Sequence, residues 1–159
     1  MGPYTPLSFP AAPHHIAVPM HIHASCVVRD GAGVLLLGPP GSGKSDLALR
    51  LLDCGFMLVA DDRVEIEDGV ARPPARLAGL LEVRGLGIVR LPHAAEARLA
   101  LAVRLGGGAP ERLPNPVRDA AIGLPVIALD AAAASAPSRV ALALGCATGR
   151  IPQLAGAFA

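Results

Sequence analysis

Hydrophobic residues in the first half of the chain follow a strand, helix, strand order. The apolar runs HASCVV and VLLLG flank RDGAG, whose Asp-Gly pair is a strong turn signal, and they predict an antiparallel hairpin over residues 23–38. Residues 45–52, SDLALRLL, predict a helix buried on one side, which Gly55 ends. The run FMLVA, residues 56–60, is typical of a strand buried on both faces of a parallel sheet. Together these elements predict a right-handed βαβ crossover.

The second half of the chain predicts mainly strands. A second Asp-Gly pair, Asp68-Gly69, indicates another hairpin, and residues 77–92 predict a loop or short strand with unusual backbone angles at their glycines. The remaining segments predict strands at 99–105 and 123–130, a flexible loop at 106–116, and either a strand or a closing helix at 138–144. The pattern indicates the α/β fold class, with a mixed β-sheet and flanking helices.

Length and composition indicate one folded domain. The 159 residues suffice for a single core, and apolar residues make up 52% of the chain against 17% charged residues. We expect a proline-rich, disordered arm at 1–20, a folded domain at 21–150 and a short tail at 151–159.

Charge and hydropathy exclude several classes of partner. The net charge is +1 and the basic residues are scattered, so we expect no nucleic-acid partner. No apolar run approaches the roughly 20 residues that span a bilayer, and the N-terminus lacks the features of a secretory signal. The expected location is therefore the cytoplasm, without membrane attachment.

The first chemical motif is GPPGSGKS, which satisfies the phosphate-loop pattern GxxxxGK[ST] between an apolar run and a helix. Its glycines let backbone N–H groups point inward, and the helix N-terminus adds partial positive charge beneath a phosphate. The lysine neutralises phosphate oxygens, and the last serine offers a hydroxyl to Mg²⁺. The motif predicts a nucleotide-phosphate site made by Gly38, Pro39, Pro40, Gly41, Ser42, Gly43, Lys44 and Ser45.

Two adjacent aspartates, Asp61 and Asp62, follow the strand predicted at 56–60. The strand after a phosphate loop can deliver an acidic residue to the metal, at the strand end where open α/β sheets bind ligands. Adjacent residues of a strand point to opposite faces, so only one aspartate needs to face the nucleotide. The other can cap a helix, form a turn or support the first.

The pair favours a kinase among the P-loop proteins. A carboxylate facing the γ-phosphate can accept the proton of an acceptor hydroxyl as the phosphoryl group is transferred. The chain contains no NKxD, which small GTPases need, and its Asp-Asp pair differs from the Asp-Glu of AAA-type ATPases. Its arginines are scattered, whereas nucleotide kinases carry an arginine-rich lid.

These motifs together resemble the catalytic domain of HPr kinase/phosphorylase, a bacterial enzyme family that phosphorylates and dephosphorylates a serine of the phosphocarrier protein HPr. The resemblance covers roughly residues 21–144 and rests on His23-Ala24, GPPGSGKS, LVADDRV and the family signature LEVRGLGIV. It implies a P-loop kinase fold, ATP and Mg²⁺ as cofactors, and HPr as the protein substrate. It also allows a homo-oligomer, because family members assemble into hexamers.

The resemblance further implies roles for single residues. Asp61 is implied as the proton acceptor in the kinase direction, and as the donor when phosphate attacks phosphoserine and pyrophosphate leaves. His23 is implied to set the charge or orientation of that aspartate, and Lys44 to bind phosphate. Arg112 is implied to reach over the site during catalysis.

The resemblance also implies a metal pair and a supporting set. Ser45 and Glu82 would hold Mg²⁺. The implied supporting residues are Asp62, Arg84, Gly85, Gly87 and Arg139. Longer family members carry an additional N-terminal domain and C-terminal helices, so we expect a short form made of the catalytic domain.

Two alternative functions use the same apparatus. A small-molecule kinase would need no protein acceptor. A regulatory module would bind ATP and a partner protein without transferring phosphate. The presence of both Asp61 and His23 argues against the regulatory module, since a sensor needs neither.

Overall fold

The structure is a computed structural model that describes residues 18–159. Residues 1–17, most of the predicted arm, lie outside the described part, and the last arm residue, Met20, already belongs to the first strand. In chain order the elements are β1 (Met20–His23), β2 (Ser25–Arg29), β3 (Ala32–Leu37), α1 (Lys44–Leu52), β4 (Met57–Ala60), β5 (Arg63–Glu67), β6 (Val70–Arg72), the 3₁₀ turn η1 (Ala75–Leu77), β7 (Leu80–Val83), β8 (Gly87–Arg90), β9 (Ala97–Leu105), β10 (Val126–Leu129) and α2 (Ala136–Ala147).

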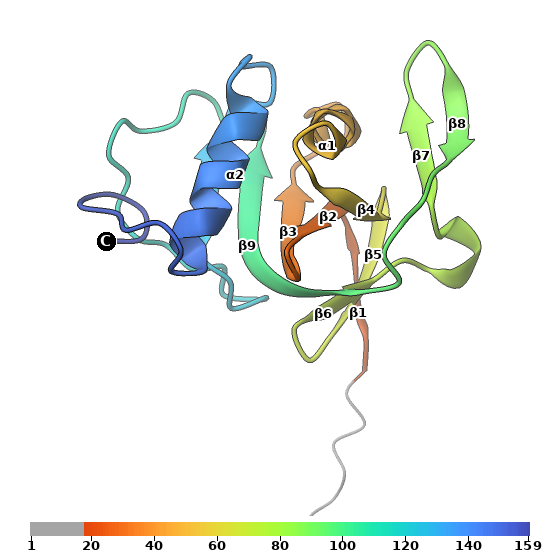
Figure 1. The fold of residues 1–159 in the computed structure, drawn as a ribbon, viewed down its shortest axis with the longest axis horizontal. Helices are drawn as coiled ribbons and strands as arrows, with labels where there is room; N and C mark the ends of the chain where they lie inside the picture. Colours follow the sequence, from red (N-terminus) through yellow and green to blue (C-terminus); the bar gives the residue numbers. More distant parts are fainter. Residues whose placement is uncertain (1–17) are drawn as a thin grey trace, which may run out of the picture.

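The main sheet, whose strands β1 to β6 and β9 are labelled in Figure 1, is mixed and has the order β1-β5-β6-β9-β3-β2-β4. Strand β10 adds to it beside β9. The α/β class with a mixed sheet and flanking helices is confirmed. Strand β4 was expected to join a parallel sheet, and this prediction was wrong, because β4 pairs antiparallel with β2. The tight hairpin places β2 beside β3, on the edge where a parallel β4 would pair. The chain returning from α1 therefore pairs with β2 and not with β3.

Both Asp-Gly hairpins are confirmed. Strands β2 and β3 join through Asp30-Gly31, and β5 and β6 through Asp68-Gly69. All four turn residues have positive φ, from 51° to 77°, as two-residue turns that follow the twist of the strands require. The first hairpin begins at Ser25 and not at His23, because His23 lies on β1, where it pairs with Arg63 of β5.

Strand β9 joins the two halves of the sheet. Along one edge it pairs parallel with β3, and along the other it pairs first with β6 and then, parallel, with β10. Strand β4 also runs parallel to β3, since both are antiparallel to β2. The carboxyl ends of β3, β4, β9 and β10 therefore point toward one edge of the sheet.

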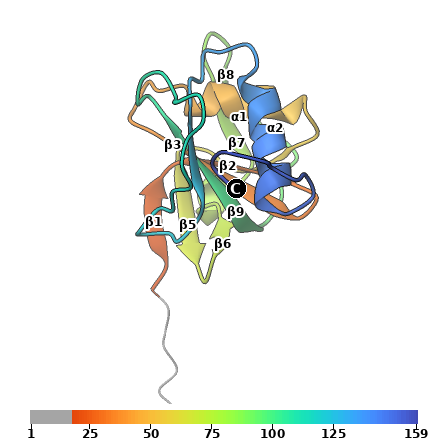
Figure 2. The ribbon, with the colours of Figure 1, turned by 90° about the vertical axis from the view of Figure 1, so that its left-hand side faces the viewer.

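Two apolar clusters fill the faces of the sheet. One lies between the sheet and the two helices, which cover the same face of the sheet (Figure 2). This cluster contains the buried Leu47 of α1 and Val140 of α2. The other lies within the curl of the sheet, where β2 contacts β5 and β4 contacts β6.

The C-terminal part of the chain forms a helix and a tail. The segment 138–144 belongs to α2, so the helix alternative predicted for it is confirmed. The tail 151–159 follows α2, and its Ala157 is buried.

The segment 77–92 forms a separate two-stranded sheet, β7 and β8, which projects from the body beside β4 and β5 (Figure 1). The predicted unusual backbone is present, with φ of 82° at Gly85 and 125° at Gly87. Leu86 and Ile88, near the tip, are exposed. Among residues 18–159, no helix is long and apolar enough to cross a membrane.

Replacing Leu101 by alanine tests the core between sheet and helices. Leu101 lies on β9 and is fully buried. We expect the free energy of unfolding to fall by about 2–5 kcal/mol, from lost burial and the cavity left behind. Leu142→Ala is the matched control, because Leu142 on α2 is exposed and should change the value by less than about 0.5 kcal/mol. Equal losses in chemical denaturation would contradict this assignment of the core.

Asp119 anchors the turn that precedes β10, and this anchor should be sensitive to acid. The hydrogen bond from Ile122 N–H, helped by those from Ala121 N–H and Arg104, lowers the pKa of the Asp119 carboxyl, although partial burial opposes the shift. A lowered pKa stabilises the fold above about pH 3.9, the ordinary value, and this stabilisation is lost as pH falls through the folded-state pKa.

We therefore expect wild type to be more stable than Asp119→Asn at neutral pH, with the gap closing below about pH 4. Chemical denaturation of both proteins between neutral and acid pH measures the gap. A gap that stays constant with pH would show that the ionisation of Asp119 contributes nothing.

Candidate functional site

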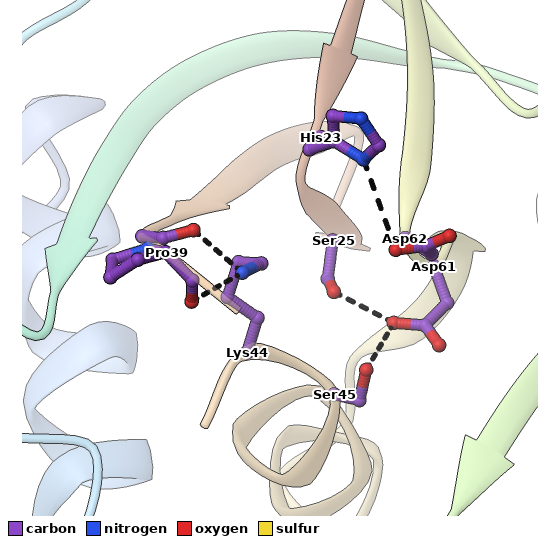
Figure 3. A network of polar contacts seen from close by, with 8 residues as sticks. His23, Ser25, Pro39, Lys44, Ser45, Asp61 and Asp62 are labelled. Carbon is purple, nitrogen blue, oxygen red and sulfur yellow. Dashed lines mark hydrogen bonds and ion pairs between the residues drawn. The ribbon is translucent and has the colours of Figure 1, made fainter. Parts of the chain in front are cut away.

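The phosphate loop connects β3 to α1. Gly41 and Gly43 have φ of 79° and 94°, values that side chains resist. Gly43 is the N-cap of α1, and no side chain caps that helix end. Lys44 folds back over the loop, where its Nζ donates to the carbonyl oxygens of Gly38 at 2.6 Å and Pro39 at 3.0 Å (Figure 3). The loop thus presents uncapped helix amides beside an ammonium group, an arrangement that binds anions.

The loop is held closely from both sides. A Cβ on Gly38 would lie 2.5 Å from Ser42 Oγ and 2.8 Å from the carbonyl oxygen of Leu105, and one on Gly43 would lie 3.0 Å from Ala131 Cβ. Ser42 Oγ is buried and has no hydrogen-bond partner among the described residues. An uncapped helix end and an unpaired hydroxyl fit a bound phosphate group.

Asp61 is the polar centre of the site. Its Oδ1 accepts hydrogen bonds from Ser25 Oγ on β2 and Ser45 Oγ on α1, each at 2.7 Å (Figure 3), and its Oδ2 accepts a long one, 3.4 Å, from the backbone N–H of Glu82 on β7. Only 7% of Asp61 is exposed. One carboxylate thus ties β2, α1 and β7 to the end of β4.

Asp62 turns the opposite way and is exposed. Its φ of 67° is uncommon for a residue with a side chain, although aspartate tolerates it better than most. Its Oδ1 lies 4.0 Å from Nδ1 of His23, and both side chains are about three-quarters exposed (Figure 3). The expected neighbour of His23 was Asp61, and this was wrong. The left-handed backbone at Asp62 aims its carboxylate toward β1, while Asp61 points to α1.

The hairpin β7–β8 carries four of the implied residues on its exposed surface. Glu82 contacts Asp61 through its backbone N–H, and its side chain is exposed. Arg84 is exposed, and Gly85 and Gly87 form the tip, both with positive φ. The structure therefore brings β7 to the aspartates, and the metal role of the Glu82 carboxylate stays a prediction.

Two implied arginines lie apart from this network. Arg112 is exposed in the long loop between β9 and β10, and within residues 18–159 it makes no hydrogen bond or ion pair. Arg139 is exposed on the first turns of α2. Neither contacts Lys44 or Asp61, so both roles stay predictions.

Sequence reasoning missed two residues of the site. Ser25 is fully buried and bonds Asp61, and the signal for it was a lone hydroxyl inside the apolar run ASCVV. Arg50 pairs with Asp46 on α1 and donates to the carbonyl oxygens of Ala131 and Ala133. Arg50 thereby links the loop after β10 to the helix that follows the phosphate loop. No local sequence pattern predicts this contact.

Oxygen donors suited to Mg²⁺ meet at the first turn of α1. Ser45 Oγ and Asp61 Oδ1 are 2.7 Å apart, and Mg²⁺ in phosphate-loop proteins is commonly held by one hydroxyl and one carboxylate, with water and phosphate completing the shell. Within residues 18–159, no group of three or more His, Cys, Asp or Glu side chains could hold a metal ion by itself. The donor set fits a metal that the nucleotide brings.

Two comparisons with known proteins agree with this geometry. The model of the family described as the HPr Serine kinase C-terminal domain matches residues 14–95. The solved structure of the Hpr(Ser) kinase/phosphatase from Coxiella burnetii is similar, with a TM-score of 0.61 and 26% identity, over 76% of this chain and 91% of that one. The matched region contains the phosphate loop, both aspartates and the β7–β8 hairpin, and the chain belongs to the HPr serine kinase C-terminal domain family, a kinase/phosphorylase family of P-loop fold.

Proposed function

We propose that this protein transfers the γ-phosphoryl group of ATP, with Mg²⁺, to a seryl hydroxyl of HPr. The observation that carries the proposal is the phosphate loop beside the buried Asp61, with the exposed Asp62 next in sequence, in a chain of the HPr serine kinase family. ATP as donor favours a cytoplasmic location.

Lys44 and the loop amides bind the phosphates. The Lys44 ammonium group, held beside Gly38 and Pro39, can turn from their carbonyl oxygens to phosphate oxygens, a stronger charge-assisted pairing. The uncapped first turn of α1 adds N–H donors. These groups hold the transferring phosphoryl group and stabilise its charge.

Asp61 and Ser45 form the metal side of the site. Buried Asp61 already accepts three hydrogen bonds, which leaves it poorly placed to meet a hydroxyl from another protein. Ser25 would hold the carboxylate in position, and Ser45 Oγ would offer an oxygen ligand to the ion. Mg²⁺ bound there would neutralise charge on the phosphate oxygens. Glu82, whose backbone N–H bonds Asp61, carries the carboxylate of β7.

Asp62 is proposed as the acid–base group, in place of Asp61. Its exposed carboxylate accepts the proton of the serine hydroxyl as the serine oxygen attacks the γ-phosphorus and the bond to ADP breaks. His23 lies beside Asp62 and orients its carboxylate. In the reverse direction protonated Asp62 returns the proton to the serine oxygen while inorganic phosphate attacks phosphoserine and pyrophosphate forms.

Exchanging each aspartate for asparagine separates the two roles. With HPr and ATP, we expect Asp62→Asn to lower kcat roughly 10²–10⁴-fold while ATP binding is kept, because only proton transfer is lost. Asp61→Asn should instead raise the Mg²⁺ concentration needed for half-maximal activity. The readout is phosphoserine on HPr by mass spectrometry, with titrations of ATP and Mg²⁺.

If Asp61→Asn instead loses kcat, and Asp62→Asn changes only the Mg²⁺ requirement, Asp61 is the acid–base group. Wild type that binds ATP yet never phosphorylates HPr would overturn the proposed function. His23→Asn should lower kcat, because Asp62 loses the side chain that orients it, and an unchanged kcat would remove His23 from the dyad.

Gly38→Ala tests the phosphate loop itself. The added Cβ would overlap Ser42 Oγ and the Leu105 carbonyl oxygen, so we expect a stability loss of about 1–3 kcal/mol and weaker pyrophosphate binding. Gly107→Ala is the matched control, since its Cβ would meet no atom within 4 Å. Thermal unfolding and calorimetric titration measure both effects. Equal behaviour of the two variants would show that close packing of the loop has no part in binding.

A further inference from the structure

A groove lies beside the phosphate loop at the carboxyl ends of β9 and β10. Its volume is about 340 Å³, within the roughly 300–1,000 Å³ of small-molecule sites. Strand residues Arg104, Ile127 and Ala128 form part of its lining, and the loop after β9 contributes most of the rest, including Pro110 and Asn115. We call it the β10 groove. In Figure 2 this loop lies on the side of the sheet away from the two helices.

A short backbone segment connects the β10 groove to the phosphate loop. Arg104 pairs in register with Leu37, the residue before Gly38. Gly106, which begins the loop after β9, is packed so closely on the phosphate loop that a Cβ there would lie 3.2 Å from Ser42 Cβ and 3.3 Å from Pro39 Cδ. One backbone segment therefore touches the phosphate loop at its start and lines the groove a few residues later.

The spacing of the strands sets the distance between the two sites. Strand β10 is separated from β3 by β9 alone, so the floor at Ala128 lies about 10 Å from the strand that ends in the phosphate loop. A ligand that fills both sites must have a phosphate chain at one end and a compact group at the other.

The lining favours an uncharged, flat group with a few polar edges. Pro110, Pro114 and Val117 supply apolar walls, and Glu111 and Asn115 supply hydrogen-bonding groups at the rim. Arg104 is already paired with Asp119 at 3.0 Å, so its charge is balanced. The groove thus suits a heterocyclic base with its sugar better than a second phosphate.

We propose that the β10 groove holds the nucleoside moiety of ATP while the phosphate loop holds its phosphates. The inference rests on the proposed function and adds where the base binds. The larger cavity, about 450 Å³, does not compete, because it lies between the start of β10, the end of α2 and the C-terminal residues, away from the phosphate loop.

The test compares a ligand with a nucleoside and one without. Isothermal titration of the full chain with Mg²⁺ measures the Kd of ATP and of inorganic tripolyphosphate for wild type and three variants. Ala128→Phe fills the groove, and Asn115→Ala removes a rim group on an exposed loop. Ala95→Phe is the control, because Ala95 is also exposed but precedes β9 at the opposite end of that strand.

We expect wild type to bind ATP more tightly than tripolyphosphate, and Ala128→Phe to weaken ATP about tenfold or more without changing tripolyphosphate. Asn115→Ala should weaken ATP alone, to a smaller extent, and Ala95→Phe should change neither ligand. If Ala128→Phe does not fold, as judged by circular dichroism, Asn115→Ala decides.

Two failures are distinguishable. If wild type binds tripolyphosphate and ATP equally well, or if the folded groove variants bind ATP like wild type, the nucleoside assignment is overturned and the phosphate site stands. If wild type binds neither ligand, the proposed function fails and the inference fails with it.

Discussion

The site depends on one topological constraint, the common direction of β3, β4, β9 and β10. Their carboxyl ends point to one edge of the sheet, so the phosphate loop, the two aspartates and the loops after β9 and β10 all start there. Strand β9 fixes the alignment because it pairs in parallel with both β3 and β10. Segments far apart in sequence thus meet at the phosphate loop, with Ala131 against Gly43 and Gly106 against Pro39.

The two aspartates differ because of one backbone conformation. Asp61 continues from β4 into the interior, where two hydroxyls and an amide satisfy its carboxylate. Asp62 adopts positive φ, which reverses the direction of the chain and leaves its side chain in solvent beside His23. A buried carboxylate in a fixed hydrogen-bond network suits a metal, and an exposed one suits proton exchange with an arriving hydroxyl.

Sequence alone predicted the features that depend on local chemistry. The Asp-Gly turns, the phosphate loop with its helix, and the glycine-rich β7–β8 tip follow from φ preferences and short spacings, and the resemblance supplied the family. Features that depend on distant partners were wrong or missed: the neighbour of β4, the carboxylate beside His23, and the hydroxyl of Ser25. The neighbour of β4 depends on which strand edge is free, and the carboxylate beside His23 depends on the left-handed backbone at Asp62. The role of Ser25 depends on a partner 36 residues away in sequence. Hydrophobic patterns encode none of these.

The exposure of the dyad bears on what kind of acceptor it serves. A kinase for a small metabolite encloses its acceptor, since desolvation strengthens the groups that hold it. His23 and Asp62 are instead largely exposed, and neither of the two cavities described above includes them. An acceptor that brings its own surface can supply the missing enclosure, with the exposed Leu86 and Ile88 of the nearby hairpin as apolar contacts. A seryl group on a folded protein meets that requirement better than a free metabolite does.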